Sequence, residues 1–226
     1  MTSASAQSVF SPHAAAGRAR IVLVPDLGER LDRYDSVMAA LADGADVVGL
    51  DHADTLVTDF EPVVDELAEL VDQDDRLPVL VGQAVGGMVV VRYAQRYPGR
   101  AAGLVLAAPV LGPWPALDLL SEMVIPSEPY GAFERETLAA VEECLATIDF
   151  DHPLGDDLPA LWLHSADDVR VPLADTRAGL DRVRGLRFEE RIHPGGRHDL
   201  LREPTALAEV AGFVARIVHG DGSAGA

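Results

Sequence analysis

An acid, a histidine and a turn framed by glycines are the residues of this sequence whose types and spacing could do chemistry. The turn is Gly82-Gln83-Ala84-Val85-Gly86, which follows a short apolar run and precedes a helix-like segment. A G-x-S-x-G turn in this setting holds a serine nucleophile on a sharp bend between a strand and a helix. Because Ala84 stands at the centre, this turn keeps the framing glycines but has no reactive oxygen.

Two later loops contain the groups that such a serine would need. A hydroxyl nucleophile requires a histidine base, a carboxylate that orients the histidine, and backbone N–H donors for the oxyanion. Asp168 follows the apolar run "ALWLHSA", with Asp167 as a competing orienting acid, and His198 lies in "HPGGRHDLLREP". The order nucleophile, acid, histidine is the one expected of this arrangement. The spacing therefore predicts a site with Ala84 in the nucleophile position, Asp168 as the acid and His198 as the base.

These stretches resemble small α/β-hydrolases of the lysophospholipase and monoacylglycerol-lipase type. The segment His164–Pro172 is similar to the family's H-G-x-x-D-x-x-V-P, with Asp168 in the place of the acid and Ser165 replacing the glycine. The segment Pro194–Pro204 matches P-G-x-x-H-E/D-x-x-x-E-P, with His198 in the place of the histidine. The resemblance covers about residues 20–110 and 158–218 and implies the α/β-hydrolase fold and serine-esterase chemistry.

An early stretch, Pro25–Glu29 followed by Arg33-Tyr34, is similar to the family's H-G-x-G-E followed by R-Y. The resemblance implies an oxyanion hole made by the backbone N–H groups of Leu27 and Val85. The chain departs from the family in this stretch, because Pro25-Asp26 replaces the histidine–glycine pair. In addition, the family's D-H-x-G-H-G loop survives only as Asp51-His52, and the first two strands of the full fold are not expected.

Alternating apolar runs and helical patterns predict an α/β fold, with a mostly parallel sheet of about six strands and helices on both faces. The expected strands are 20–24, 46–50, 78–82, 103–110, 160–166 and 186–192, and the expected helices are 34–41, 60–71, 86–97 and 205–218. Residues 18–220 are expected to form a single domain, in which about 112–157 form an inserted cap. Residues 1–17 and 221–226 are expected to be disordered tails.

Apolar side chains of the expected cap could form the wall of a substrate pocket over Ala84. These candidates are Trp114, Leu117, Leu120, Met123, Tyr130 and Phe133. The alternative is that they only pack the cap onto the sheet. Because several glutamates lie in the same segment, an anionic phospholipid head is disfavoured. The expected substrate is a small, neutral, apolar carboxylic ester, lactone or thioester, such as a monoacylglycerol.

The composition excludes several other classes of protein. A net charge of −19 argues against nucleic acid and anionic membranes as partners. The single cysteine, Cys144, and the absence of a secretory signal or of a spanning apolar run fit a soluble, cytoplasmic protein without stable membrane association. The sequence has no metal-ligand spacing and no dinucleotide fingerprint, so neither a metal nor a cofactor is expected. The oligomeric state stays open.

Two explanations of Ala84 remain open at the level of sequence. In the first, which is favoured because the motifs around Asp168 and His198 are retained, the native residue is serine and Ala84 is an engineered knockout. Nucleophilic catalysis should then be lower by roughly 10⁶-fold in this chain. In the second, the alanine is natural, and the protein either binds a small molecule or uses His198 as a general base in non-hydrolytic chemistry.

Overall fold

The described strands form one sheet in the computed structural model of this 226-residue chain. The structure describes residues 9–10, 17–26, 28–52, 60–111, 146, 148–149, 153–154, 157–195 and 197–219. The strand order is β1-β3-β2-β4-β5-β6-β7. The strands are β1 (Val9–Phe10), β2 (Ala19–Val24), β3 (Ala45–Gly49), β4 (Val79–Gln83), β5 (Gly103–Ala107), β6 (Leu158–Ser165) and β7 (Leu186–His193). All neighbours pair in parallel except β1, which is antiparallel to β3.

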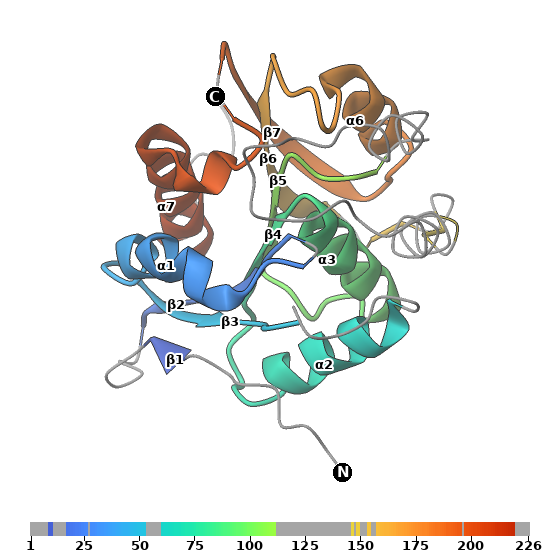
Figure 1. The fold of residues 1–226 in the computed structure, drawn as a ribbon. Helices are drawn as coiled ribbons and strands as arrows, with labels where there is room; N and C mark the ends of the chain where they lie inside the picture. Colours follow the sequence, from blue (N-terminus) through green and yellow to red (C-terminus); the bar gives the residue numbers. More distant parts are fainter. Residues whose placement is uncertain are drawn as a thin grey trace, which may run out of the picture.

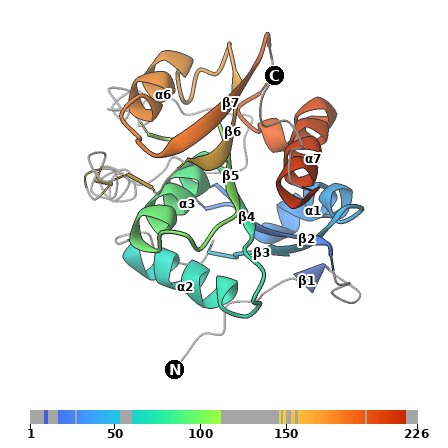
Figure 2. The same cartoon turned by 180° about the vertical axis from the view of Figure 1, so that it is seen from behind.

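Helices cover both faces of this sheet (Figures 1 and 2). They are α1 (Asp35–Leu41), α2 (Glu61–Val71), α3 (Val85–Arg96), α6 (Leu173–Leu180) and α7 (Pro204–His219), with 3-10 turns η1 (Leu31–Tyr34) and η2 (Leu200–Arg202). Apolar residues of α2, α3 and α6 belong to one buried cluster, and those of α1 and α7 belong to the other. The sheet therefore separates two cores, as expected of strands that alternate with helices.

The central strands are apolar on both faces because both faces are covered. Every residue of β2, β4 and β5 is buried, whereas β7 at the edge of the sheet is largely half-buried or exposed. Continuous apolar runs are typical of parallel strands that lie between two layers of helices. These runs are the pattern from which the sequence predicted the strands.

The direction in which the chain adds strands to the sheet reverses between β2 and β4. The chain passes from β2 to β3 on one side and then returns to place β4 on the other side of β2. Val24 at the end of β2 lies opposite Gly82 of β4 in the register. In open parallel sheets such a switch point is the place where ligands bind. The loop that contains Asp26 and the turn that contains Ala84 both begin here.

The structure confirms the predicted α/β class and the mostly parallel sheet with helices on both faces. It adds α6, which the sequence analysis did not expect, and it corrects one detail of the N-terminal tail. Val9 and Phe10, predicted to lie in a disordered tail, pair with Val48 and Val47 of β3. Most of the expected cap, 112–157, lies outside the described residues, so the cap stays a prediction.

Candidate active site

The turn after β4 has the bend of a nucleophile elbow. Ala84 adopts φ 47° and ψ −108°, a conformation that L-residues rarely adopt and that costs of order 1–3 kcal/mol. Hydrogen bonds hold it: the Ala84 N–H donates to the carbonyl of Ala107 over 2.8 Å, and the Ala84 carbonyl accepts the Gly87 N–H over 3.0 Å. The chain therefore maintains a strained turn although the central side chain carries no reactive atom.

The two framing glycines are required by close backbone approaches. A Cβ on Gly82 would lie 2.6 Å from Cα of Gly87, and one on Gly86 would lie 2.9 Å from the carbonyl carbon of Val24. Real Cβ atoms essentially never approach other atoms so closely. The N-terminus of α3 is thus pressed against the end of β2, which brings the Val85 N–H next to the loop that contains Asp26.

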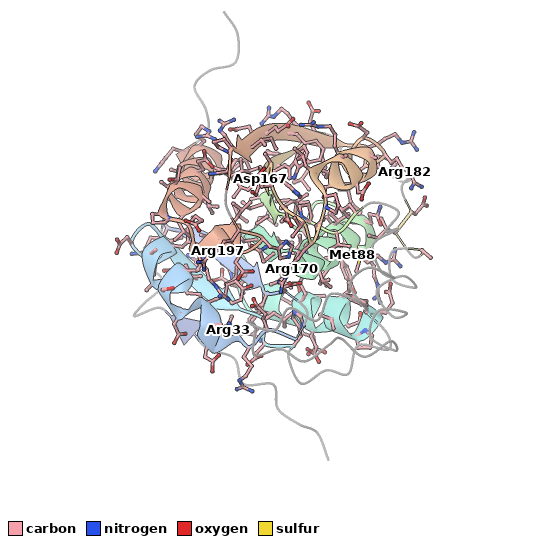
Figure 3. All side chains as sticks on the ribbon, turned by 45° about the horizontal axis from the view of Figure 1, so that its top comes forward. Arg33, Met88, Asp167, Arg170, Arg182 and Arg197 are labelled. Carbon is pink, nitrogen blue, oxygen red and sulfur yellow. The ribbon has the colours of Figure 1, made fainter. Side chains whose placement is uncertain are left out.

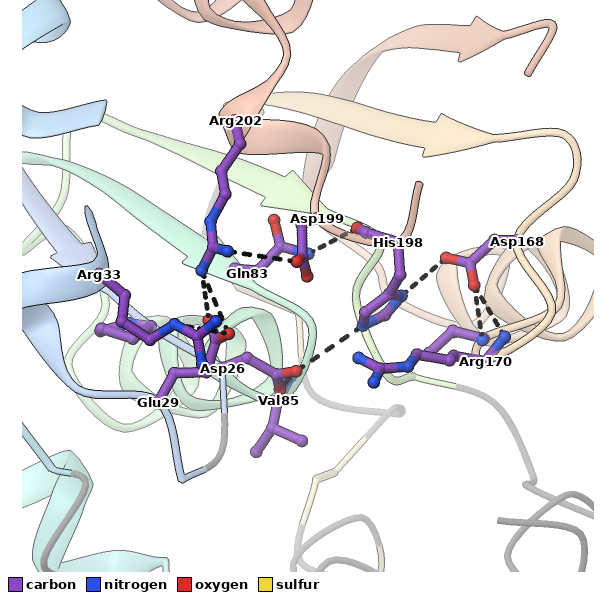
Figure 4. Close-up of polar contacts among 12 residues, drawn as sticks. Asp26, Glu29, Arg33, Gln83, Val85, Asp168, Arg170, His198, Asp199 and Arg202 are labelled. Atoms are coloured by element: carbon purple, nitrogen blue, oxygen red, sulfur yellow. Dashed lines mark hydrogen bonds and ion pairs between the residues drawn. The ribbon is translucent and has the colours of Figure 1, made fainter. Parts of the chain in front are cut away.

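His198 and Asp168 meet at the carboxyl ends of β6 and β7, as the sequence predicted. His198 Nδ1 lies 2.8 Å from Asp168 Oδ2, although the two residues are 30 positions apart (Figure 4). The other oxygen, Oδ1, accepts the backbone N–H groups of Arg170 at 2.9 Å and Val171 at 3.0 Å. Both oxygens of Asp168 are therefore occupied, and its position fixes the His198 ring with Nε2 facing away from it.

His164 lies beneath this pair and has a structural environment. Its side chain is fully buried, its Nε2 lies 2.9 Å from the Val171 carbonyl, and its Nδ1 accepts the indole N–H of Trp162 over 3.4 Å. Burial is the main reason why its pKa is lowered. A neutral ring that donates from Nε2 satisfies both contacts.

The side chain of Asp26 faces His198 Nε2 and the elbow. Its Oδ1 accepts the Val85 N–H over 3.2 Å, and its Oδ2 lies 3.7 Å from His198 Nε2 (Figure 4). The side chains of Asp26 and His198 are only 13% and 9% exposed. Asp26 thus contacts the very N–H predicted to receive an oxyanion and the ring nitrogen predicted to act on a nucleophile. The sequence analysis identified Asp26 only as a departure from the family.

His198 lies between two carboxylates. Burial acts to lower the pKa of His198, but the hydrogen bonds and charges of Asp168 and Asp26 outweigh burial and raise this pKa to about 10. For Asp168, burial alone would raise the pKa, yet hydrogen bonding to His198 and the His198 charge bring it below its usual value. The two carboxylates therefore favour the protonated ring, whose single positive charge is shared between them.

A buried polar network holds the loop that contains Asp26. The Asp26 N–H donates to the Tyr34 hydroxyl over 3.4 Å, and this hydroxyl donates to Glu29. Arg202, from η2 close to His198, donates to Glu29 at 3.2 and 3.4 Å and stacks over the Tyr34 ring. Burial raises the pKa values of Glu29 and Tyr34. This network gives a physical role to Glu29 and Arg33-Tyr34, because Glu29 is bonded to Tyr34, paired with Arg33 and tied to Arg202 of η2.

Two further residues position the site, and the sequence analysis assigned a role to neither. The Gln83 side-chain amide donates to the backbone carbonyl of His198 over 2.9 Å, and Gln83 is fully buried. His52 Nε2 lies 3.2 Å from the Pro25 carbonyl, and burial lowers the His52 pKa. A polar residue inside an otherwise apolar strand–turn segment was the available signal for Gln83. For His52, the surviving Asp51-His52 pair was the signal.

The remaining predicted site residues fall into two groups. Asp167 is exposed and donates its N–H to Ser165 Oγ over 3.3 Å, so Asp168 is the acid in contact with His198. Figure 3 shows the loops after β6 and β7, labelled at Asp167, Arg170 and Arg197, in the central part of the view. Leu27 and the predicted pocket residues lie outside the described part of the chain: Trp114, Leu117, Leu120, Met123, Tyr130 and Phe133.

Two negative findings apply to the described residues. Among them, no group of three or more histidine, cysteine or acidic side chains could hold a metal ion. Within the same ranges, no helix is both long and apolar enough to cross a membrane.

Comparisons with known proteins agree with this geometry. Residues 15–135, more than half of the chain, match the family described as "Serine aminopeptidase, S33". A monoacylglycerol lipase of Mycolicibacterium smegmatis is 24% identical, and the alignment covers 83% of each protein. The structure also resembles the Paleococcus ferrophilus monoacylglycerol lipase (TM-score 0.68, 18% identity, 96% of this chain and 99% of that one). A similar likeness is found to mouse alpha/beta hydrolase domain-containing protein 10 (TM-score 0.69, 12% identity, 94% and 93%). The chain belongs to the serine aminopeptidase S33 family and is a lipase-like α/β-hydrolase.

Proposed function

We propose that the site is built to hydrolyse a small, neutral, apolar carboxylic ester, lactone or thioester by an acyl-enzyme mechanism that requires serine at position 84. In this mechanism Ser at this position attacks the carbonyl carbon, and His198 removes the hydroxyl proton. Asp168 orients the ring, and His198 then passes the proton to the leaving group. Water that is activated by His198 releases the acid in the second half of the reaction.

The observation that carries this proposal is the 2.8 Å contact between His198 and Asp168 beside a turn with the φ and ψ of Ala84. A strained turn persists only where the surrounding structure holds it, and such turns cluster at functional sites. The bend, the base and its orienting acid are together, so the nucleophile oxygen is the missing part.

The substrate class rests on the family and on the chain's own charge. The lipases that resemble this chain are named for a neutral acylglycerol. The net charge of −19 disfavours an anionic head group near the site, and Asp26 adds a negative charge inside it. A small, neutral, apolar substrate is consistent with both features.

The experiment is the substitution Ala84→Ser, assayed with p-nitrophenyl butyrate and with a fluorophosphonate probe that labels activated serines. We expect the substituted protein to be labelled and to turn over the ester, whereas the alanine chain does neither. Adding His198→Ala should abolish both readouts, because no base then remains. Absence of labelling in a folded Ala84→Ser protein, even after the Asp26 side chain is also removed, would refute the proposal.

A second candidate function is favoured by Asp26. The carboxylate beside His198 Nε2 gives the alanine chain an acid–base pair of its own, without any serine. This arrangement suits proton transfer in a non-hydrolytic reaction. It also accounts for Ala84 as a natural residue, because Asp26 and Ala84 both depart from the family and lie at the same site. Under this alternative, the alanine chain has an activity that His198→Ala removes and Ala84→Ser does not increase.

A further inference from the structure

The site contains an anion-binding arrangement that the chain fills with its own side chain. The Val85 N–H stands at the N-terminus of α3, where free backbone donors and the helix dipole favour a negative group. His198 Nε2 faces the same point from the loop after β7. The carboxylate of Asp26 lies between them, 3.2 Å from the Val85 nitrogen and 3.7 Å from His198 Nε2.

We propose that Asp26 is an internal carboxylate that occupies the oxyanion position, so that it slows acyl transfer and allows an external carboxylate to bind only when this side chain is removed. The kinetic part of the inference rests on the proposed function, whereas the binding part does not. Asp26 is therefore a specificity-determining residue of the site.

The electrostatic reason is that an oxyanion and Asp26 compete for one donor. In acyl transfer the negative charge of the tetrahedral intermediate develops where backbone N–H groups can receive it. Here one of those N–H groups is already satisfied by a carboxylate, which also repels a second negative charge. The Asp26 backbone is held in turn through Tyr34 and Glu29, so the loop has a fixed place.

Asp26 also determines the protonation of His198. The charged and titratable groups near the ring are Asp26 from the loop after β2, Asp168 from the loop after β6, and His164 beneath Asp168. The two carboxylates favour the imidazolium, and an imidazolium cannot remove a proton from a serine. Removal of Asp26 leaves Asp168 as the carboxylate in contact with the ring, as a catalytic histidine requires.

Three measurements test the inference. In the kinetic one, the rate of fluorophosphonate labelling is compared between Ala84→Ser and Ala84→Ser/Asp26→Ala. The loss of one oxyanion donor typically costs 10²–10³-fold, so we expect labelling to rise by about 10²-fold or more. Asp32→Ala in the serine background is the control, because it removes the same charge from an exposed side chain. Equal rates in the two serine proteins would overturn the inference.

The other two measurements use the alanine chain and do not depend on a serine. When butyrate is titrated into Asp26→Ala, the Val85 amide signal in a ¹⁵N spectrum should shift until the site is saturated. The same signal should not shift in the chain that keeps Asp26. The ¹⁵N signals of the His198 ring should titrate at lower pH in Asp26→Ala. If Asp26→Ala fails to fold, Asp26→Asn is used instead, because it keeps the side-chain volume and removes the charge. In Asp26→Asn the His198 ring should titrate at lower pH, and no butyrate binding is expected.

The outcomes separate this inference from the proposed function. If a folded Asp26→Ala protein does not bind butyrate, the assignment of Asp26 is wrong. The assignment is equally wrong if the His198 ring titrates at the same pH in a folded Asp26 variant as in the unsubstituted chain. If butyrate binds and His198 titrates lower, yet the doubly substituted serine protein is not labelled, Asp26 keeps its assigned role and the serine-hydrolase proposal fails.

Discussion

Gly86→Ala should destabilise the protein through a clash with backbone atoms at the end of β2. A Cβ at this position would fall inside contact distance of the Val24 and Pro25 carbonyl oxygens and lie 2.9 Å from the Val24 carbonyl carbon. These are backbone atoms in and next to a sheet strand, so no side chain can rotate away. Overpacking of this kind costs roughly 1–3 kcal/mol, and the rigid surroundings place the expected loss near about 3 kcal/mol.

Urea and thermal unfolding, followed by circular dichroism, measure this loss of stability. For a domain of this size, about 3 kcal/mol corresponds to a fall in Tm of roughly 6–12 °C. Gly44→Ala is the matched control, because a Cβ there meets no atom within 4 Å and the residue is outside the left-handed region. Its free energy of unfolding should change by less than about 1 kcal/mol. A Gly86→Ala protein as stable as the Gly44→Ala control would refute the proposed close packing of α3 against β2.

The remaining predictions concern His198 and its acid. Because the folded-state pKa of His198 is raised to about 10 from 6.5, its contribution to stability is fully present below pH 6.5 and is lost as the pH rises through 10. The free energy of unfolding should therefore fall between pH 7 and pH 10, and it should fall less in His198→Gln; parallel curves for the two proteins would contradict this. In the Ala84→Ser protein, Asp168→Asn should lower kcat by roughly 10⁴-fold, as in serine triads, whereas exposed Asp167→Asn should change it little. Comparable losses in both variants would contradict the assignment of Asp168.

The sequence by itself determined the order of the parallel strands β2 to β7 and the main contact of the site. Continuous apolar runs predicted the parallel strands, because strands covered on both faces need apolar residues on both. The G-x-A-x-G turn and the two loop motifs predicted that Asp168 and His198 would meet near Ala84. Local sequence patterns suffice here because the loops that follow parallel strands all lie at the same edge of the sheet.

The tertiary structure alone decided what Asp26 does. Its side chain could have pointed to solvent, and nothing in the residues around it indicated the contact with the Val85 N–H. That contact depends on how closely α3 packs against β2, and the packing is set by Gly82 and Gly86 together with the register between β2 and β4.

The buried network around Glu29 likewise required three-dimensional information. Glu29 and Arg202 are 173 positions apart, and each would be an ordinary surface residue if judged by its neighbours in sequence. The burial of Glu29 and its ion pair with Arg202 depend on distances between separate loops. A sequence pattern specifies which residues each loop contains, whereas the charge state of His198 follows from which carboxylates the fold brings within a few ångströms of it.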